Sequence, residues 1–571
     1  MPHRPLSSAL TALTLAAGLV LAPGTGAAQQ DTLRDPIVVS SQNGRLTARL
    51  EVFLDTLAQV PDTDGQYQRM SLRSYRLTLA NGTAYDVKGF PGPTFRVFPG
   101  DSVEILLVNR LKRETSTGCA HYPAVDSLPA RDTFPNCFHG LNDTNLHFHG
   151  FHVTPRGTGD NVLEPVKAGD STRYAFRVPP NQSPGTHWYH PHMHGAVALQ
   201  VMNGMSGAFL MAGGPLDVMV ERLGMRDRLV AIQQVDTVLN LMGSVAVPAP
   251  QASLINGQHQ PVIEMLPGEV QRWRIVNENV SATAATYRLI VGSGPSAAAP
   301  ALYDIARDGV QYAPQNYDTI PDDTLLVWPG SRLDVFAQAP LAEGTHTLKA
   351  VRVSQRASGR GRRPGAGADT VALFQVRVVS GSRTVPSVLP TALPPLPPFL
   401  ANLDTTVRDT SAFVQFTDVG AVPTSLSNPV AVYLGTDSTP YQKYDPDSVF
   451  LDLPLDGTQL WKVSNASAIG VNHPFHIHIN PFQVVAVVQP DTADPNSWLY
   501  AQLNAAAARG FPIWLDTVPL PLSNGSDLGY IVIRQQYADF TGKFVMHCHI
   551  LGHEERGMMQ LLEVTRHPRR E

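Results

Sequence analysis

Four short histidine blocks constrain the fold of this chain more than any other feature. Most of its nineteen histidines lie in them, and the blocks read LHFHGFH at 146–152, HWYHPHMH at 187–194, HPFHIH at 473–478 and HCHILGH at 547–553. Each block contains a His-x-His pair, and on a β-strand residues i and i+2 point to the same face. The chain must therefore fold so that four strands bring their paired imidazoles to one place.

These pairs predict a polynuclear metal site. Neutral imidazole is the commonest nitrogen ligand of transition metals in proteins. Eight imidazoles are too many for one tetrahedral zinc ion, so several ions must share them. The eight are His147, His149, His190, His192, His476, His478, His547 and His549.

A second, mononuclear site is expected on the opposite face of the last block. Cys548 stands between two of the paired histidines, so its thiol points away from them. His473 has the matching parity in the third block, while His553 and Met558 follow Cys548 by five and ten residues. Two His, one Cys and a weak axial Met form the blue-copper arrangement. Met559 stays an alternative axial ligand, because the segment after His553 can form a helical turn.

The rest of the chain has the pattern of an all-β protein with internal repeats. Residues 95–109, 263–277 and 449–465 each read as an apolar segment, a Pro-Gly or Asp-Gly turn, an alternating strand and Asn. A second match joins 166–179 to 327–340. Alternation marks half-buried strands and these dipeptides mark turns. Three copies predict three consecutive Greek-key β-sandwich domains.

The domain organisation follows from these repeats and from proline content. We expect a signal peptide at 1–28, domains at 35–215, 216–385 and 401–571, and a Pro-rich linker at 386–400. Pro-rich segments of this kind form extended connections.

The N-terminus indicates export. Arg4 precedes an apolar stretch at 9–22 that is too short to span a membrane, and small residues at 26–28 suit signal cleavage. Without a twin arginine, Sec export to the periplasm or the exterior is expected. A net charge of −5 gives no case for binding nucleic acid or an anionic membrane, and we expect a monomer without membrane insertion.

The remaining cysteines predict a disulfide bond. Cys119 and Cys137 lie in one polar, Pro-containing region, and an exported chain permits a bond between them. Two separate buried cysteines are the alternative, because connectivity does not follow from sequence alone.

In their order and spacing, the four blocks resemble the copper motifs of the multicopper oxidases, a family that includes laccases, cuprous oxidases and ferroxidases. The resemblance covers the whole mature chain and implies three cupredoxin domains with four copper ions: one type 1, one type 2 and a type 3 pair. One departure is Ile479-Asn480, where many members have Gly after the third motif.

The resemblance also implies the role of each ligand. His473, Cys548 and His553 would hold the type 1 copper with Met558 axial, and His147 and His476 would hold the type 2 copper. The type 3 pair would take the other six imidazoles: His149, His190, His192, His478, His547 and His549.

Two carboxylates are candidate catalytic residues. Glu554 follows ligand His553 directly and matches an acid that relays protons in related oxidases. Asp160 resembles the acid near the type 2 copper, although a short insertion separates it from its motif, and an ordinary solvated loop residue is the alternative. Reduction of O2 to water consumes four protons, so such groups are chemically required.

We therefore predict a copper-dependent oxidase that couples one-electron oxidation of a reductant to four-electron reduction of O2 to water. Nitrite reductases have two cupredoxin domains and fewer imidazoles, and a copper-free scaffold should lack ligands that this chain retains. Copper sequestration without turnover is compatible with the ligands.

The donor is predicted to be a phenol or an aromatic amine. Cuprous oxidases of the family often carry a Met-rich insertion, and residues 340–460 contain no such stretch. A metallo-oxidase acting on Cu(I), Fe(II) or Mn(II) is the alternative.

Overall fold

The structure is a computed structural model of the chain. It describes residues 31–79, 82–85, 90–113, 136–235, 252–280, 287–290, 299–322, 324–352, 370–403, 410–419, 431–435, 442–467, 470–525 and 527–566. The predicted signal peptide lies outside these residues, as does Cys119.

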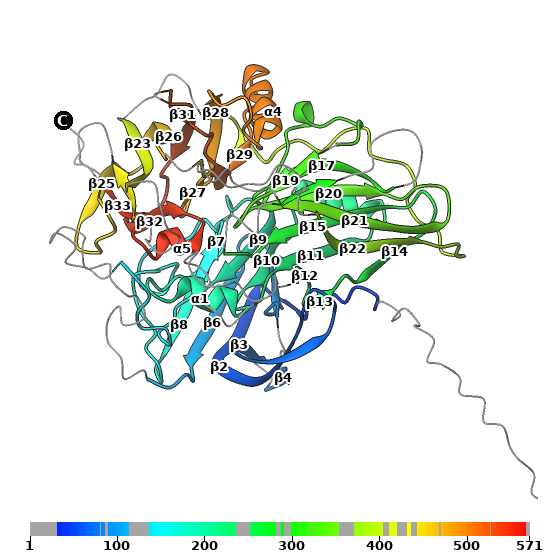
Figure 1. The fold of residues 1–571 in the computed structure, drawn as a ribbon, viewed down its shortest axis with the longest axis horizontal. Helices are drawn as coiled ribbons and strands as arrows, with labels where there is room; N and C mark the ends of the chain where they lie inside the picture. Colours follow the sequence, from blue (N-terminus) through cyan, green and yellow to red (C-terminus); the bar gives the residue numbers. More distant parts are fainter. Residues whose placement is uncertain are drawn as a thin grey trace, which may run out of the picture.

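The described chain folds into three β-sandwiches, coloured blue to cyan, green, and yellow to red in Figure 1. In the first, one sheet has the order β1 (Val38–Ser40), β5 (Thr94–Val97), β10 (Gly207–Met211), β9 (Gly185–His190), β7 (His147–His149). Its facing sheet has the order β4 (Ala84–Tyr85), β3 (Tyr67–Leu79), β2 (Arg45–Pro61), β6 (Ser102–Asn109), β8 (Ser171–Arg177).

The second sandwich has a seven-stranded and a five-stranded sheet. The larger has the order β13 (Gln258–His259), β12 (Leu254–Ile255), β11 (Asp227–Gln233), β15 (Val270–Asn277), β20 (Arg332–Gln338), β17 (Ala301–Arg307), β18 (Val310–Gln311). The smaller has the order β14 (Val262–Met265), β22 (Thr370–Val378), β21 (Gly344–Arg352), β16 (Tyr287–Ile290), β19 (Thr324–Val327).

The third sandwich has a six-stranded and a five-stranded sheet. The first has the order β24 (Ala431–Gly435), β23 (Thr410–Val419), β26 (Thr458–Asn465), β31 (Gly529–Gln536), β28 (Phe482–Val488), β29 (Trp514–Leu515). The second has the order β25 (Val449–Pro454), β33 (Met559–Thr565), β32 (Gly542–Cys548), β27 (Pro474–Ile477), β30 (Thr517–Pro519).

The same topology recurs in each sandwich and explains the sequence repeats. The predicted repeat units are β5–β6, β14–β15 and β25–β26, and each crosses from one sheet to the facing sheet at its turn. In every copy the second strand of the unit pairs in parallel with an earlier strand: β2 with β6, β11 with β15, β23 with β26. The predicted all-β fold of three sandwiches is confirmed, whereas the predicted domain bounds of 35–215, 216–385 and 401–571 stay predictions.

Alternating burial holds each sandwich together. Along the first part of β2, Leu46, Ala48, Leu50 and Val52 are buried while the residues between them are partly exposed. Such side chains meet those of the facing sheet and form apolar cores, and the core of the third sandwich continues into buried residues of the second, such as Val270 and Phe336.

Helices are short and lie at the margins of the sheets. They are α1 (Val197–Met202), α2 (Pro215–Arg222), α4 (Ser497–Ala508), α5 (Leu551–Glu554) and the 3-10 turns Pro314–Asn316 and Pro398–Leu400. Within the described residues, no helix has the length and apolarity needed to cross a membrane.

The histidine blocks occupy neighbouring strands of two sandwiches. In the first, β7 pairs with β9 and His147 lies opposite His190. In the third, β27 pairs with β32 and His476 lies opposite His547. Labels β7, β9, β27, β32 and α5 gather near the middle of Figure 1, where the blue-to-cyan and yellow-to-red regions meet.

Candidate metal centre

Imidazoles from the first and third sandwiches interleave at their junction. His147 stacks on His478 with ring centroids 3.9 Å apart, and His149 stacks on His476 at the same distance. The Nε2 atoms of His192 and His547 are 3.1 Å apart. The eight predicted imidazoles thus form one buried group, which we call the polynuclear group, as strand parity indicated.

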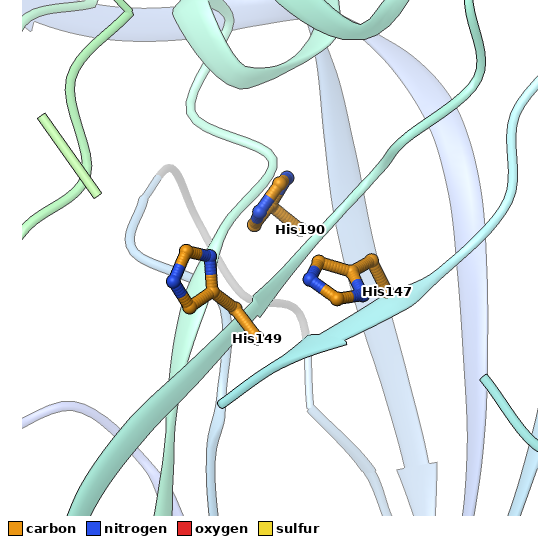
Figure 2. A group of neighbouring side chains, drawn as sticks. All are labelled: His147, His149 and His190. Atoms are coloured by element: carbon orange, nitrogen blue, oxygen red, sulfur yellow. The ribbon is translucent and has the colours of Figure 1, made fainter. Parts of the chain in front are cut away.

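Several subsets of this group could each hold an ion. Figure 2 shows the rings of His147, His149 and His190 turned toward a common space, and one nitrogen of each lies within 4.8 Å of the others. The same criterion unites His147 with His476 and His478, and His192 with His478 and His547. His147 and His478 each belong to two of these sets. The candidate ion positions are therefore adjacent, as a polynuclear centre requires.

In three of these rings a hydrogen bond at Nδ1 leaves Nε2 facing inward. Nδ1 of His147 contacts Asp160 at 2.8 Å, Nδ1 of His190 contacts the Pro191 carbonyl at 2.7 Å, and Nδ1 of His476 contacts the Asp516 carbonyl at 2.8 Å. Their Nε2 atoms are buried and have no hydrogen-bond partner in the described part of the chain. Buried polar atoms are rarely left unpaired, so these lone pairs fit a metal ion.

The electrostatics agree with metal binding. Burial lowers the pKa of most of these histidines, and repulsion from neighbouring imidazoles adds to the effect; the pKa of His476 falls to about 3 and that of His192 to about 4. The same direction holds for His147, His149, His190, His478 and His549. These seven rings are therefore neutral near pH 7, which is the form that binds metal.

A separate group lies on the other face of β32. Sγ of Cys548 is 3.5 Å from Nδ1 of His473 and 3.7 Å from Nδ1 of His553, and the two Nδ1 atoms are 3.2 Å apart. Burial raises the pKa of the Cys548 thiol, so its thiolate needs a cation beside it. We call Cys548, His473 and His553 the mononuclear group.

Strand register distinguishes the two candidate axial methionines. Met559 pairs with His547 across β32 and β33, and paired residues on adjacent strands point to the same face. The next position joins the Cys548 amide to the Met558 carbonyl at 3.1 Å, so Met558 shares the face of Cys548. Met558 also packs in the core that contains Cys548, whereas Met559 packs against Val545 and Leu561.

Both candidate carboxylates contact the polynuclear group. Asp160 is buried and accepts the Phe148 amide at 2.9 Å beside its contact with His147, and burial raises its pKa to about 7. Glu554 lies 3.1 Å from Nδ1 of His547 and 3.5 Å from Nδ1 of His192. Burial acts to raise the pKa of Glu554, but the fields of these two histidines lower it to about 2.

Three further residues at the polynuclear group were not predicted from the sequence. Asp516 contacts His149 at 3.2 Å and pairs with buried Arg332, while the Trp188 ring stacks on His190 at 4.3 Å. A lone Asp or Arg in a β-protein carries no motif. Only the position of Trp188 inside the second histidine block could have indicated its place.

Ile479, where many members of the family have Gly, has an unusual backbone conformation. Ile479 has φ of +34°, a region that favours glycine and that a β-branched residue rarely adopts. The backbone at 479 therefore keeps a conformation suited to the glycine found in many relatives. Asn480 then bridges the two sandwiches, since its Oδ1 lies 2.6 Å from Nδ1 of His152.

The predicted Cys119–Cys137 disulfide is a prediction still, because Cys119 lies outside the described residues. Cys548 is a free, buried cysteine, as its predicted role in the mononuclear group requires.

Two family models match the chain. Both are described as multicopper oxidase, and they cover residues 136–214 and 422–568. These are the segments that contain the histidine blocks of the first and third sandwiches.

Relatives and solved structures that are similar to the chain include further multicopper oxidases and laccases. A multicopper oxidase of Staphylococcus epidermidis is 22% identical, with 90% of this chain and 92% of that protein covered; a laccase of Bacillus stratosphericus is 24% identical, with 90% and 93% covered. A metallo-oxidase from Campylobacter jejuni superposes with a TM-score of 0.64 at 21% identity, covering 94% of this chain and 95% of that one. A Pediococcus acidilactici laccase gives 0.63 at 19%, covering 94% of each.

Fold and site together define a class: a cupredoxin-type copper oxidoreductase in which a mononuclear Cys–His group adjoins a polynuclear histidine group. Segments of the first and third sandwiches match multicopper oxidase family models, and the chain is similar to multicopper oxidases and laccases over 90% of its length. It holds four copper ions, one type 1, one type 2 and two type 3, and uses O2 as electron acceptor.

The mononuclear group leads to a first prediction. Copper-loaded protein should absorb strongly in the visible through charge transfer from the Cys548 thiolate, and Cys548→Ser should abolish both the colour and turnover. Serine is close in size, so far-UV circular dichroism should be unchanged. A Cys548→Ser variant that stays blue would show that another residue supplies the thiolate.

Register leads to a second prediction. A thioether that donates weakly to copper stabilises Cu(II), so Met558→Leu should raise the reduction potential of the blue copper. Met559→Leu is the matched control and should leave the potential unchanged, because that side chain points to the opposite face. Spectroelectrochemical titration of both variants decides between the two methionines, and a shift confined to Met559→Leu contradicts the assignment.

Proposed function

We propose that the protein is a laccase-like oxidase that takes single electrons from phenolic or aromatic amine donors. The observation that carries this donor class is the positive charge of the Arg556 guanidinium beside the mononuclear group. His553 and Arg556 are both partly exposed, and after burial the field of Arg556 is the next cause that lowers the pKa of His473 and of His553. A fixed positive charge favours phenolate or other electron-rich aromatic donors and disfavours Fe(II) or Cu(I).

The ligand roles follow the resemblance and the groups. His473, Cys548 and His553, with Met558, would hold the type 1 copper, and His147 and His476 the type 2 copper. The type 3 pair would be held by the remaining members of the polynuclear group. When bound, the coppers supply the one-electron steps and the four-electron reduction of O2.

The chain itself connects the two groups. Cys548 lies with His473 and His553, while its neighbours His547 and His549 belong to the polynuclear group. A few covalent bonds along the backbone therefore join them. Burial of Cys548, His547 and His549 excludes water from this connection, which keeps the electrostatic interactions strong.

Glu554 and Asp160 are suited to hold and move protons. The Glu554 carboxylate is buried between His192 and His547, and Asp160 is buried against His147. A carboxyl group in such a place can accept a proton from solvent and deliver it to a nearby oxygen. We propose Glu554 as the main relay and Asp160 as the group that orients His147.

A metallo-oxidase is the second candidate, because the structurally similar Campylobacter jejuni multicopper oxidase is a metallo-oxidase. The charge at residue 556 separates the two candidates, since the donors differ in the sign of their charge.

Removal of the carboxylate charge at Glu554 tests the relay. Glu554→Gln should slow O2 reduction by roughly 10²–10⁴-fold, the range for a general acid or base, while anaerobic reduction of the blue copper stays near normal. Stopped-flow spectroscopy measures both rates. If anaerobic reduction slows instead, Glu554 tunes the mononuclear group and is not a relay.

Glu555→Gln is the matched control for that experiment. Burial and the charge of Glu554 raise the pKa of Glu555, and the substitution makes the same change of atoms at the neighbouring position. Its Oε2 accepts the amide of Gly195 and its Oε1 that of Ala198, so glutamine keeps an acceptor for one of these two amides. O2 reduction should change little, because in the described part of the chain these oxygens bond backbone amides and not an imidazole of the polynuclear group.

Charge reversal at Arg556 tests the donor class. Arg556→Glu should raise KM for a sulfonated aromatic donor about tenfold, at the low end of electrostatic steering effects, and should accelerate Fe(II) oxidation. The contrast should shrink at high salt, because salt screens exposed charges. Arg177→Glu on β8, an edge strand of the first sandwich, makes the same change in net charge and should alter neither donor. Faster Fe(II) than phenol turnover in the unmodified enzyme would overturn the proposal.

A further inference from the structure

The second sandwich contributes no histidine to the polynuclear group. One of its arginines, Arg332, nevertheless lies at the edge of that group. Arg332 begins β20 and its side chain is fully buried. Its guanidinium donates to Asp516 through Nη1 at 2.7 Å and Nη2 at 2.5 Å, and Nε donates to the Thr186 carbonyl at 3.1 Å. Thr186 lies on β9 of the first sandwich and Asp516 precedes β30 of the third. One side chain therefore ties together all three sandwiches.

Asp516 in turn contacts two imidazoles from different sandwiches. Its Oδ1 lies 3.2 Å from Nε2 of His149, and its backbone carbonyl lies 2.8 Å from Nδ1 of His476. The opposite nitrogens, Nδ1 of His149 and Nε2 of His476, are buried and lack a hydrogen-bond partner among the described residues. Asp516 thus determines which nitrogen of each ring is available for a metal.

A second carboxylate fixes the backbone around this pair. Asp308 accepts the amides of Asp516 at 3.2 Å and Thr517 at 3.1 Å through Oδ2, and the amide of Arg332 at 3.0 Å through Oδ1. Thr517 also donates its hydroxyl to Asp516 Oδ1 at 2.9 Å. Arg332 therefore lies between two buried carboxylates, and neither can turn without breaking several hydrogen bonds.

The close approach of this pair also explains the glycine of the first motif. A Cβ at Gly150 would lie 2.5 Å from Nη2 of Arg332 and 2.9 Å from Oδ2 of Asp516. The backbone there has φ of +87° as well, so a side chain is excluded twice. The residue that follows His149 is small because the Arg332–Asp516 pair occupies the space.

We propose that Arg332 is a positioning residue for the copper centre and that it acts on His149 and His476 through Asp516. Its bidentate fork holds the carboxylate in one orientation, which a single ammonium group cannot do. Loss of the fork should let Asp516 rotate and should free both rings to change nitrogen. Such outer partners of metal ligands are typically worth 10–100-fold in metal affinity. This proposal goes beyond the donor assignment and does not depend on it.

The test substitutes Arg332→Lys in copper-loaded protein and measures copper, not turnover. We expect a chelator to remove the type 2 copper at least tenfold faster, and the type 2 hyperfine splitting in the electron paramagnetic resonance spectrum to change. The blue absorption band should be unchanged, because Arg332 does not contact the mononuclear group.

Arg307→Lys is the matched control. Arg307 is equally buried on neighbouring strand β17, where it pairs with Asp304 at 2.9 Å and donates to the Tyr312 hydroxyl at 3.0 Å. The substitution removes a buried fork from the same sheet without a contact to Asp516. Its copper release and type 2 spectrum should equal those of the unmodified protein.

Two outcomes would overturn the proposal. One is an Arg332→Lys protein with unmodified copper release and type 2 spectrum; the other is an equal loss of copper in Arg307→Lys, which would indicate general loosening of the second sandwich. If Arg332→Lys does not fold, the isosteric Asp516→Asn carries the test: it removes the charge that orients Arg332 but keeps the side-chain size, and the same spectral change is expected.

Discussion

Eight imidazoles buried against one another are the constraint on which the rest of this structure depends. Each ring has lost its water, and the inward nitrogens of rings such as His147 and His190 have no protein partner among the described residues. Desolvated lone pairs that face each other are costly unless a cation lies between them. Copper binding and the docking of the first sandwich on the third are therefore linked, because neither half of the ligand set is complete alone.

The second sandwich has a role that its lack of histidine blocks conceals. Its buried Arg332 and Asp308 form a network with Asp516, and this network reaches rings from both other sandwiches. A buried ion network is weak grounds for stability, since desolvation offsets much of the attraction. Its value here lies in orientation: it fixes which nitrogen each ring presents.

The two faces of β32 divide the electrostatic tasks. On one face, Cys548 lies with two histidines beside the partly exposed Arg556, where an outside donor can approach. On the other face, His547 belongs to a buried group that contacts the buried carboxylate of Glu554. In the proposed function, electron entry and proton delivery therefore take place on opposite faces of one strand, and the Cys548-His549 and His547-Cys548 peptides join the two groups.

The sequence by itself determined the fold class, the three repeats and the grouping of the ligands, because the two-residue period of a strand is a local property. Parity alone put Cys548 opposite His547, and the structure agrees. Parity could not decide between Met558 and Met559, since the choice depends on how β33 pairs with β32 after a helical turn. Only the tertiary structure placed Arg332 against Asp516, which follows it by 184 residues. That contact exists because three sandwiches pack around one point, and no local pattern encodes where separate sheets will meet.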